Sequence, residues 1–119
     1  MGNVNRRFFK SIKVMGEWEG RQRSFFLDYY IIEKEILIDG FTFHTYGLEI
    51  AKRTDSGDES AEFRRVYDVF CTEKEAVESL NVLIRNAVTP VCLLEVLEDM
   101  IGVGDFVNEE SSIMLRKEA

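Results

Sequence analysis

Ile36-Leu37-Ile38-Asp39-Gly40-Phe41-Thr42-Phe43 is the stretch that decides the fold. β-Branched and aromatic residues stand on both sides of the pair Asp39-Gly40. Asp and Gly tolerate the positive φ angles that a two-residue type I′ turn requires, and this turn matches the twist of paired strands. The sequence therefore predicts a β-hairpin whose turn is Asp39-Gly40.

Further strands are expected on both sides of this hairpin. Residues 8–18 alternate between apolar and polar side chains, and residues 24–38 are dense in aromatic and β-branched types. A polar break at Gly20-Arg21-Gln22 separates these two segments. A polar, Gly-containing loop is expected over residues 54–60, and another strand over residues 62–71. The sequence thus predicts four antiparallel strands in up-and-down order.

In the strand expected after the Asp39-Gly40 turn, the apolar side chains switch from odd-numbered to even-numbered positions. Phe41 and Phe43 are odd-numbered, whereas Tyr46, Leu48 and Ile50 are even-numbered. Side chains alternate between the two faces of a strand, so a bulge or bend near residues 44–46 would restore the phase.

The hydrophobic period changes to that of a helix at Thr72-Glu73-Lys74-Glu75, where Thr72 is a typical N-cap with a Glu three residues later. Thr89-Pro90 starts a second helix, which ends at Gly102-Val103-Gly104. We therefore predict an α+β fold, in which an antiparallel four-stranded meander is followed by two C-terminal helices packed on one face of the sheet. Residues 1–104 form one domain, and residues 105–119 form a weakly structured C-terminal tail.

Composition limits the classes of partner. The 119 residues are 45% hydrophobic and carry a formal net charge of -7, which opposes binding to a phosphate backbone. No apolar run approaches the roughly 18–20 residues that a membrane-spanning helix needs, and the N-terminal residues do not resemble an export signal. Cys71 and Cys92 are expected to be reduced, buried thiols. These features indicate a cytoplasmic protein with no nucleic-acid or membrane partner.

Four short blocks resemble a family of small uncharacterised proteins of clostridial-type bacteria. They are Tyr29-Tyr30-Ile31-Ile32-Glu33, Tyr46-Gly47-Leu48-Glu49-Ile50, Asn86-Ala87-Val88-Thr89-Pro90 and Leu94-Glu95-Val96-Leu97-Glu98-Asp99. The resemblance covers residues 25–101. It implies a cytoplasmic bacterial protein of unknown function, from lineages that include spore formers. The resemblance assigns no catalytic role to any residue of this sequence.

No motif in the sequence indicates catalysis, a cofactor or a metal site. His44 is the single histidine, and an exposed or half-buried strand residue is the more common role for a lone histidine. Cys71 and Cys92 lack the spacing of zinc ligands. We therefore predict that the protein is not an enzyme, with no catalytic, cofactor-binding or metal-binding residues.

Two functions follow as hypotheses. If helices cover one face of the sheet, Phe26, Tyr30 and Ile32 lie on the other face, where an apolar patch would mark a protein-partner or homodimer surface. The first hypothesis is therefore a non-enzymatic interaction or regulatory module. The alternative is a small-ligand-binding domain with a pocket between sheet and helices, in which His44, Tyr46 or Arg64 orients a polar or anionic group.

Overall fold

A computed structural model describes residues 3–54, 62–101 and 109–111 of the chain. The sheet order is β1-β2-β3-β4-β5, and all neighbouring strands are antiparallel. The strands are β1 (Asn3–Trp18), β2 (Arg21–Ile38), β3 (Phe41–Thr54), β4 (Glu62–Phe70) and β5 (Glu109–Ser111). The helical elements are α1 (Glu73–Arg85), the 3₁₀ helix η1 (Pro90–Cys92) and α2 (Leu93–Ile101). The four-stranded meander and the two later helices confirm the predicted α+β fold.

Two tight turns connect the first three strands. Asp39 and Gly40 have φ angles of 52° and 82°, which confirms the predicted hairpin. A second turn of the same character lies at Glu19 and Gly20, with φ angles of 53° and 77°. The first turn therefore ends at Gly20, and β2 begins at Arg21, inside the predicted polar break Gly20-Arg21-Gln22.

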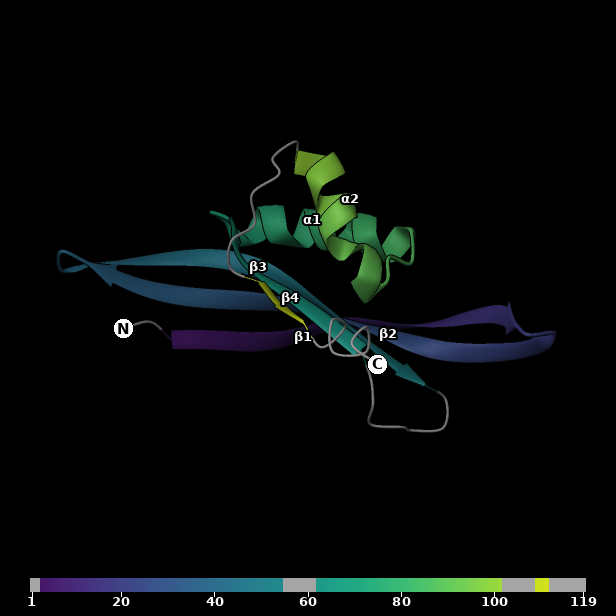
Figure 1. The fold of residues 1–119 in the computed structure, drawn as a ribbon. Helices are drawn as coiled ribbons and strands as arrows, with labels where there is room; N and C mark the ends of the chain where they lie inside the picture. The colour runs from purple at the N-terminus through teal and green to yellow at the C-terminus, as the bar shows by residue number, and fades with distance from the viewer. Residues whose placement is uncertain (1–2, 55–61, 102–108, 112–119) are drawn as a thin grey trace.

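Both helices lie on one face of the sheet, as Figure 1 shows. The core is formed between them and the sheet. The Tyr29 hydroxyl at its centre donates a 2.8 Å hydrogen bond to the Val88 carbonyl in the turn after α1, so the sheet is tied to the helical layer. The fully or nearly buried apolar residues of this core are Leu27, Tyr29, Ile31, Leu48, Ile50, Val66, Ala76, Leu80, Leu83, Val88, Leu93 and Leu97.

Helix α1 begins where the sequence predicts. The Thr72 hydroxyl oxygen accepts a 3.2 Å hydrogen bond from the backbone N–H of Glu75, which satisfies one of the amides at the helix start. The Thr72 hydroxyl and the Glu75 carboxylate also form a 3.2 Å hydrogen bond. One half of the capping-box pattern is therefore present, together with a direct contact between the two side chains.

The bulge predicted in β3 is wrong. The pairing of β2 with β3 continues without interruption from Phe25↔Thr54 to Ile38↔Phe41. Phe41 and Phe43 simply lie on the opposite face from Leu48 and Ile50. The irregularity between β3 and β4 is instead in β4, opposite Gly47, where Asp68 has a φ of 59°. A second irregularity occurs in β1 at Phe9.

The β2–β3 hairpin projects beyond its neighbours. Residues 36–44, here called the β2–β3 arm, form a two-stranded ribbon, because the described part of β1 pairs only as far as Glu35 and the described β4 pairs only from Tyr46. Figure 1 shows the arm extending past both helices. The opposite end of the sheet is formed by the β1–β2 turn.

The sequence pattern of the C-terminal tail does not predict a strand. Glu109–Ser111 forms β5, whose three residues pair with residues 64–66 of β4. The remaining residues of the predicted tail, and residues 55–60 of the predicted loop, lie outside the described residues.

Candidate functional site

The sheet face turned away from α1 and α2, here called the helix-distal face, carries an ordered polar and aromatic network. In β2 its residues are the even-numbered ones, because Leu27, Tyr29 and Ile31 point into the core. The strand register places residues of β1, β3 and β4 on the same face beside them. Two carboxylates on this face, those of Asp28 and Glu49, are buried.

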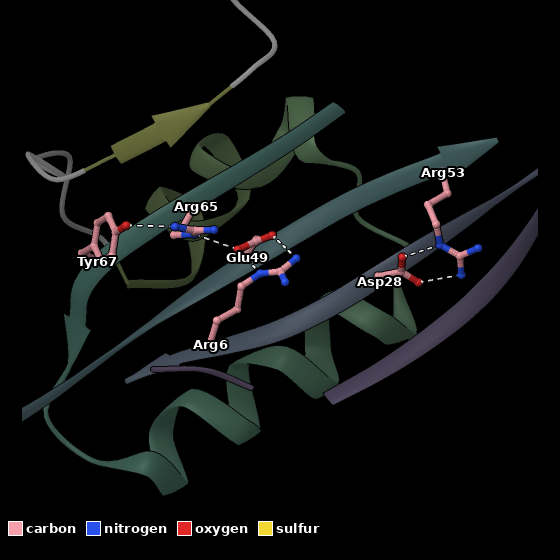
Figure 2. Close-up of polar contacts among 6 residues, drawn as sticks. All are labelled: Arg6, Asp28, Glu49, Arg53, Arg65 and Tyr67. Carbon is pink, nitrogen blue, oxygen red and sulfur yellow. Dashed lines mark hydrogen bonds and ion pairs between the residues drawn. The ribbon is translucent and has the colours of Figure 1, made fainter. Parts of the chain in front are cut away.

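Glu49, which is 2% exposed, is held by two arginines from different strands (Figure 2). Arg6 of β1 donates from Nε and from one terminal nitrogen to the two carboxylate oxygens, at 3.0 and 2.9 Å. Arg65 of β4 donates from Nε at 2.7 Å. Arg65 also donates to the Tyr67 hydroxyl at 3.1 Å. A charge removed from water is stable only when it is paired and hydrogen-bonded, and these contacts supply that pairing across three strands.

Asp28 forms the second centre of the network. Arg53 of β3 donates to its two carboxylate oxygens at 2.6 and 3.1 Å, and the Ser11 hydroxyl of β1 donates at 2.6 Å. Burial acts to raise the pKa of this carboxyl, but the hydrogen bonds from Arg53 and Ser11 outweigh burial and hold the pKa below its ordinary value. Asp28 is therefore an ionised structural group that joins β1, β2 and β3.

Aromatic rings cover the cations of the network. The guanidinium carbon of Arg6 lies 3.7 Å from the centre of the Tyr30 ring, and that of Arg53 lies 4.6 Å from the centre of the Phe26 ring. Phe8 meets Tyr30 edge to face, with ring centroids 5.6 Å apart. Cations above aromatic faces are attracted by the ring quadrupole, so these contacts give the face a defined shape.

The structure places the three predicted interface residues on the helix-distal face. Phe26 and Tyr30 are half-buried within the cation–aromatic contacts, whereas Ile32 is only 1% exposed and contributes little to the surface. The side chains that do form the surface were not singled out in the sequence analysis. Their positions follow from the alternation of side chains along each strand. Phe8 pairs with Tyr30 and Phe43 pairs with Ile36, so both lie on the same face as the even-numbered residues of β2.

Exposed apolar side chains are concentrated on this face. Seven large apolar side chains of the described β1 to β4 are exposed, and the register puts six of them on the helix-distal face, each 50–68% exposed. The seventh, Leu37, is on the other side of the β2–β3 arm. The six are Val4, Phe8, Met15, Ile38, Phe41 and Phe43.

The predicted ligand-orienting residues share the other side of the sheet, the side of the helices, but they are spread along it. His44 is exposed, with its Nε2 3.5 Å from a Glu35 carboxylate oxygen and 4.0 Å from one of Glu33. Tyr46 packs against the core, and Arg64 is paired with Ile50, six residues along β3 from His44. Six strand residues span roughly 20 Å, so these side chains do not converge on one small molecule.

Neither cysteine is buried. Cys71 and Cys92 are free thiols, as expected, but both are exposed, so the expectation of buried thiols is wrong. Cys71 lies in the connection between β4 and α1, and Cys92 is the last residue of the short helix η1. Neither is on the apolar face of α1 or α2, which explains their exposure. Among the described residues, no group of three or more His, Cys, Asp or Glu side chains is placed to hold a metal ion.

No helix in the described part of the chain is long and apolar enough to cross a membrane.

Comparison with curated proteins gave no match, and neither did comparison with solved structures. A family model does match, over residues 10–103, which include most of β1 and all of β2 to α2. The described network of Asp28 and Glu49 therefore lies almost wholly within the matched region, and the chain belongs to the family of unknown function DUF6514.

Proposed function

We propose that the protein is a non-enzymatic interaction module that binds a second copy of itself through the helix-distal face. The observation that carries this proposal is the set of six exposed apolar side chains gathered on that face. Single exposed apolar residues are ordinary in monomers, but a one-sided group along a sheet is typical of a surface that becomes covered. A second sheet packed face to face would cover it and bury these side chains.

The distribution of charge supports a second copy as the partner. Among the described side chains of β1 to β4, the helix-distal face is nearly balanced, with five bases (Arg6, Lys13, Lys34, Arg53, Arg65) and four acids (Glu17, Asp28, Glu49, Asp68). The two helices carry two bases (Lys74, Arg85) and six acids (Glu73, Glu75, Glu78, Glu95, Glu98, Asp99). Two copies of a chain with net charge -7 repel each other least when their acidic layers point apart, and pairing of the helix-distal faces does this.

The buried network supports the same proposal in another way. Arg6, Arg53 and Arg65 are held by carboxylates of their own chain, so the face presents shaped aromatic and aliphatic surface between cations that are already paired. Little side-chain ordering is then needed when a second copy binds, which lowers the entropic cost of association.

The proposal also covers the cellular location of the module and the class of its partner. It acts in the bacterial cytoplasm, where thiols such as Cys71 and Cys92 stay reduced, and it binds protein rather than nucleic acid because of its net negative charge. The alternative, a small-ligand domain, stays a prediction. A thermal-shift screen of metabolites tests it separately, since a bound ligand raises the midpoint of unfolding.

The test is the solution mass measured by light scattering across protein concentrations from about 1 to 100 μM, a range that covers weak to tight self-association. We expect the wild-type protein to be a dimer in the upper part of this range. The double variant Phe8→Ser, Phe43→Ser is expected to be monomeric throughout, because both side chains are exposed and lie on the helix-distal face.

The matched control is Val91→Ser, which removes an equally exposed apolar side chain from η1, on the helical side. It is expected to stay dimeric. Circular dichroism checks that all three proteins fold. A wild-type protein that is monomeric at every concentration overturns the proposal, and so does a double variant that dimerises as the wild type does.

A further inference from the structure

Most of the exposed apolar side chains of the helix-distal face lie toward the β2–β3 arm. The Phe8–Tyr30 pair is close to the middle of both strands and divides this face into two halves. The half from this pair to the Asp39-Gly40 turn is here called the arm half, and the rest, which ends at the Glu19-Gly20 turn, is called the far half. Of the six exposed apolar side chains that the described strands place on this face, Met15 is the one in the far half. The other five are Val4, Phe8, Ile38, Phe41 and Phe43.

The charges on the strands of the arm half are paired within the chain. Glu49 is held by two arginines at 2.9 and 2.7 Å, and the Lys34 ammonium lies 3.2 Å from an Asp68 carboxylate oxygen. With the acid in the turn included, the described residues from β1 to β4 give the arm half three bases and three acids. They are Arg6, Lys34, Arg65, Asp39, Glu49 and Asp68. A second copy therefore meets a surface without net charge there, and like-charge repulsion does not oppose the contact.

The far half carries two exposed charged side chains that form no ion pair with a described residue. They are Lys13 and Glu17, both in β1. The Lys13 ammonium lies 5.8 Å from the centre of the Phe26 ring. Burial of an unpaired charge is costly, and the cores of protein interfaces are poor in charged residues and rich in aromatic ones. The arm half is therefore better suited to burial than the far half.

The β2–β3 arm is also stabilised by a cover. A two-stranded ribbon alone is marginally stable in water, and residues 36–44 pair only with one another among the described strands. Phe41 and Phe43 are 68% and 50% exposed on the same side of this ribbon. Packing of these rings against a second copy would remove their apolar surface from water and stabilise the arm.

We infer that the two copies of the homodimer contact each other through the arm half, with Phe41 and Phe43 as aromatic anchors, while the far half stays in water. This inference rests on the proposed homodimer and states which part of the helix-distal face forms it. The contact is isologous, so the arm half of each copy packs against the arm half of the other. A few buried aromatic anchors carry most of the binding energy in contacts of this kind.

The test compares the single variants Phe41→Ser and Met15→Ser, which remove side chains that are 68% and 60% exposed from opposite halves of the same face. Light scattering across a dilution series gives the dissociation constant of each dimer. Phe41→Ser is expected to raise this constant by more than about tenfold, as the loss of an anchor does. Met15→Ser is expected to change it by less than about twofold, because Met15 stays in water in the dimer.

Leu37→Ser is the matched control within the arm, because Leu37 is 60% exposed on the other side of the same ribbon. It is expected to leave the dissociation constant within about twofold of the wild type, which separates loss of the contact from damage to the arm. A Met15→Ser or Leu37→Ser variant that weakens the dimer as much as Phe41→Ser overturns the arm-half contact and leaves the homodimer standing. A wild-type protein that is monomeric at every concentration overturns both.

Amide hydrogen exchange gives a second readout on the unaltered protein. It is measured by mass spectrometry at two concentrations, one at which light scattering gives mostly monomer and one at which it gives mostly dimer. Residues 36–44 are expected to exchange several-fold more slowly in the dimer, because the second copy opposes local opening of the arm. Residues 19–24 at the far end are expected to exchange equally in both. Slowing at the far end without slowing in the arm contradicts the inference, and so does a dimer in which neither segment changes.

Discussion

Glu49 shows at the scale of one residue how the helix-distal face is held. Its carboxylate accepts hydrogen bonds from Arg6 and Arg65, which reach it from strands on opposite sides. Removal of one partner from a buried ion pair is costly because the remaining charges lose their partner while they stay partly dehydrated. Arg6 is 44% exposed, which reduces the cost on its side.

We therefore expect Glu49→Gln to lower the free energy of unfolding by about 1.5–3 kcal/mol, the range for hydrogen bonds to charged groups. Denaturation in urea measures it. Glu33→Gln is the control, since the contacts of Glu33 with Arg7 and His44 are 3.9 and 4.0 Å long, too long for hydrogen bonds. The three side chains are 27–42% exposed, and such long, partly exposed pairs contribute less than about 1 kcal/mol. Equal losses in the two variants would show that the Glu49 network adds no special stability.

Asp28 makes stability depend on pH. Its pKa in the folded protein is lowered, so the ionised form stabilises the fold above the pKa of the unfolded chain, and this stabilisation disappears as the pH falls through the folded pKa. The wild type is expected to exceed Asp28→Asn in unfolding free energy at pH 7, and the difference is expected to shrink below about pH 4. Urea denaturation across pH 2.5–7 checks this, and a difference that does not vary with pH would contradict it.

Gly47 matters at the scale of the elements, because β3 and β4 approach each other closely there. A Cβ atom at Gly47 would lie 1.8 Å from the Val66 carbonyl oxygen, which belongs to the backbone of β4 just before its irregularity. Neither atom can move without a shift of a whole strand. The glycine is thus required by the packing of β4 against β3, whereas its φ angle imposes no such requirement.

Gly47→Ala is expected to destabilise the protein by about 1–3 kcal/mol or more, as overpacking does in other folded proteins. Gly16→Ala is the control in the same sheet. A Cβ atom there meets nothing within 4 Å, so its unfolding free energy is expected to change by less than about 1 kcal/mol. Thermal and urea unfolding compare the variants, and a Gly47→Ala protein as stable as the control would refute the close approach.

At the scale of the whole molecule, the sequence was informative where a local signal decided the structure. Asp39-Gly40 required a turn, and Thr72 required a helix start, so the meander and the helical layer were both predictable. The irregularity in β4 at Asp68 was not, because it depends on how β4 meets β3 and not on the residues near it.

The candidate site was predictable only in outline. The alternation of Phe26, Tyr30 and Ile32 indicated a second face to the sheet, but the burial of Ile32 and the pairing of Arg6 with Glu49 depend on neighbours 43 residues apart in the sequence. Phe41 and Phe43 appeared to be out of phase because a buried face was assumed along the whole strand. In the structure both belong to the exposed β2–β3 arm, where their side chains lie on the helix-distal face.

The order of the strands has a consequence for synthesis on the ribosome. From β1 to β4 each strand pairs with the one just before it in the chain, so the sheet can assemble as the chain emerges. The helices that cover Leu27 and Tyr29 emerge after these four strands. At about 5–20 residues per second, residues 73–101 take roughly 1.5–6 seconds to translate, and for that interval the helices do not yet cover the nascent sheet. Chaperones that hold unfolded chains can thus bind the exposed apolar face of the sheet until α2 has been translated.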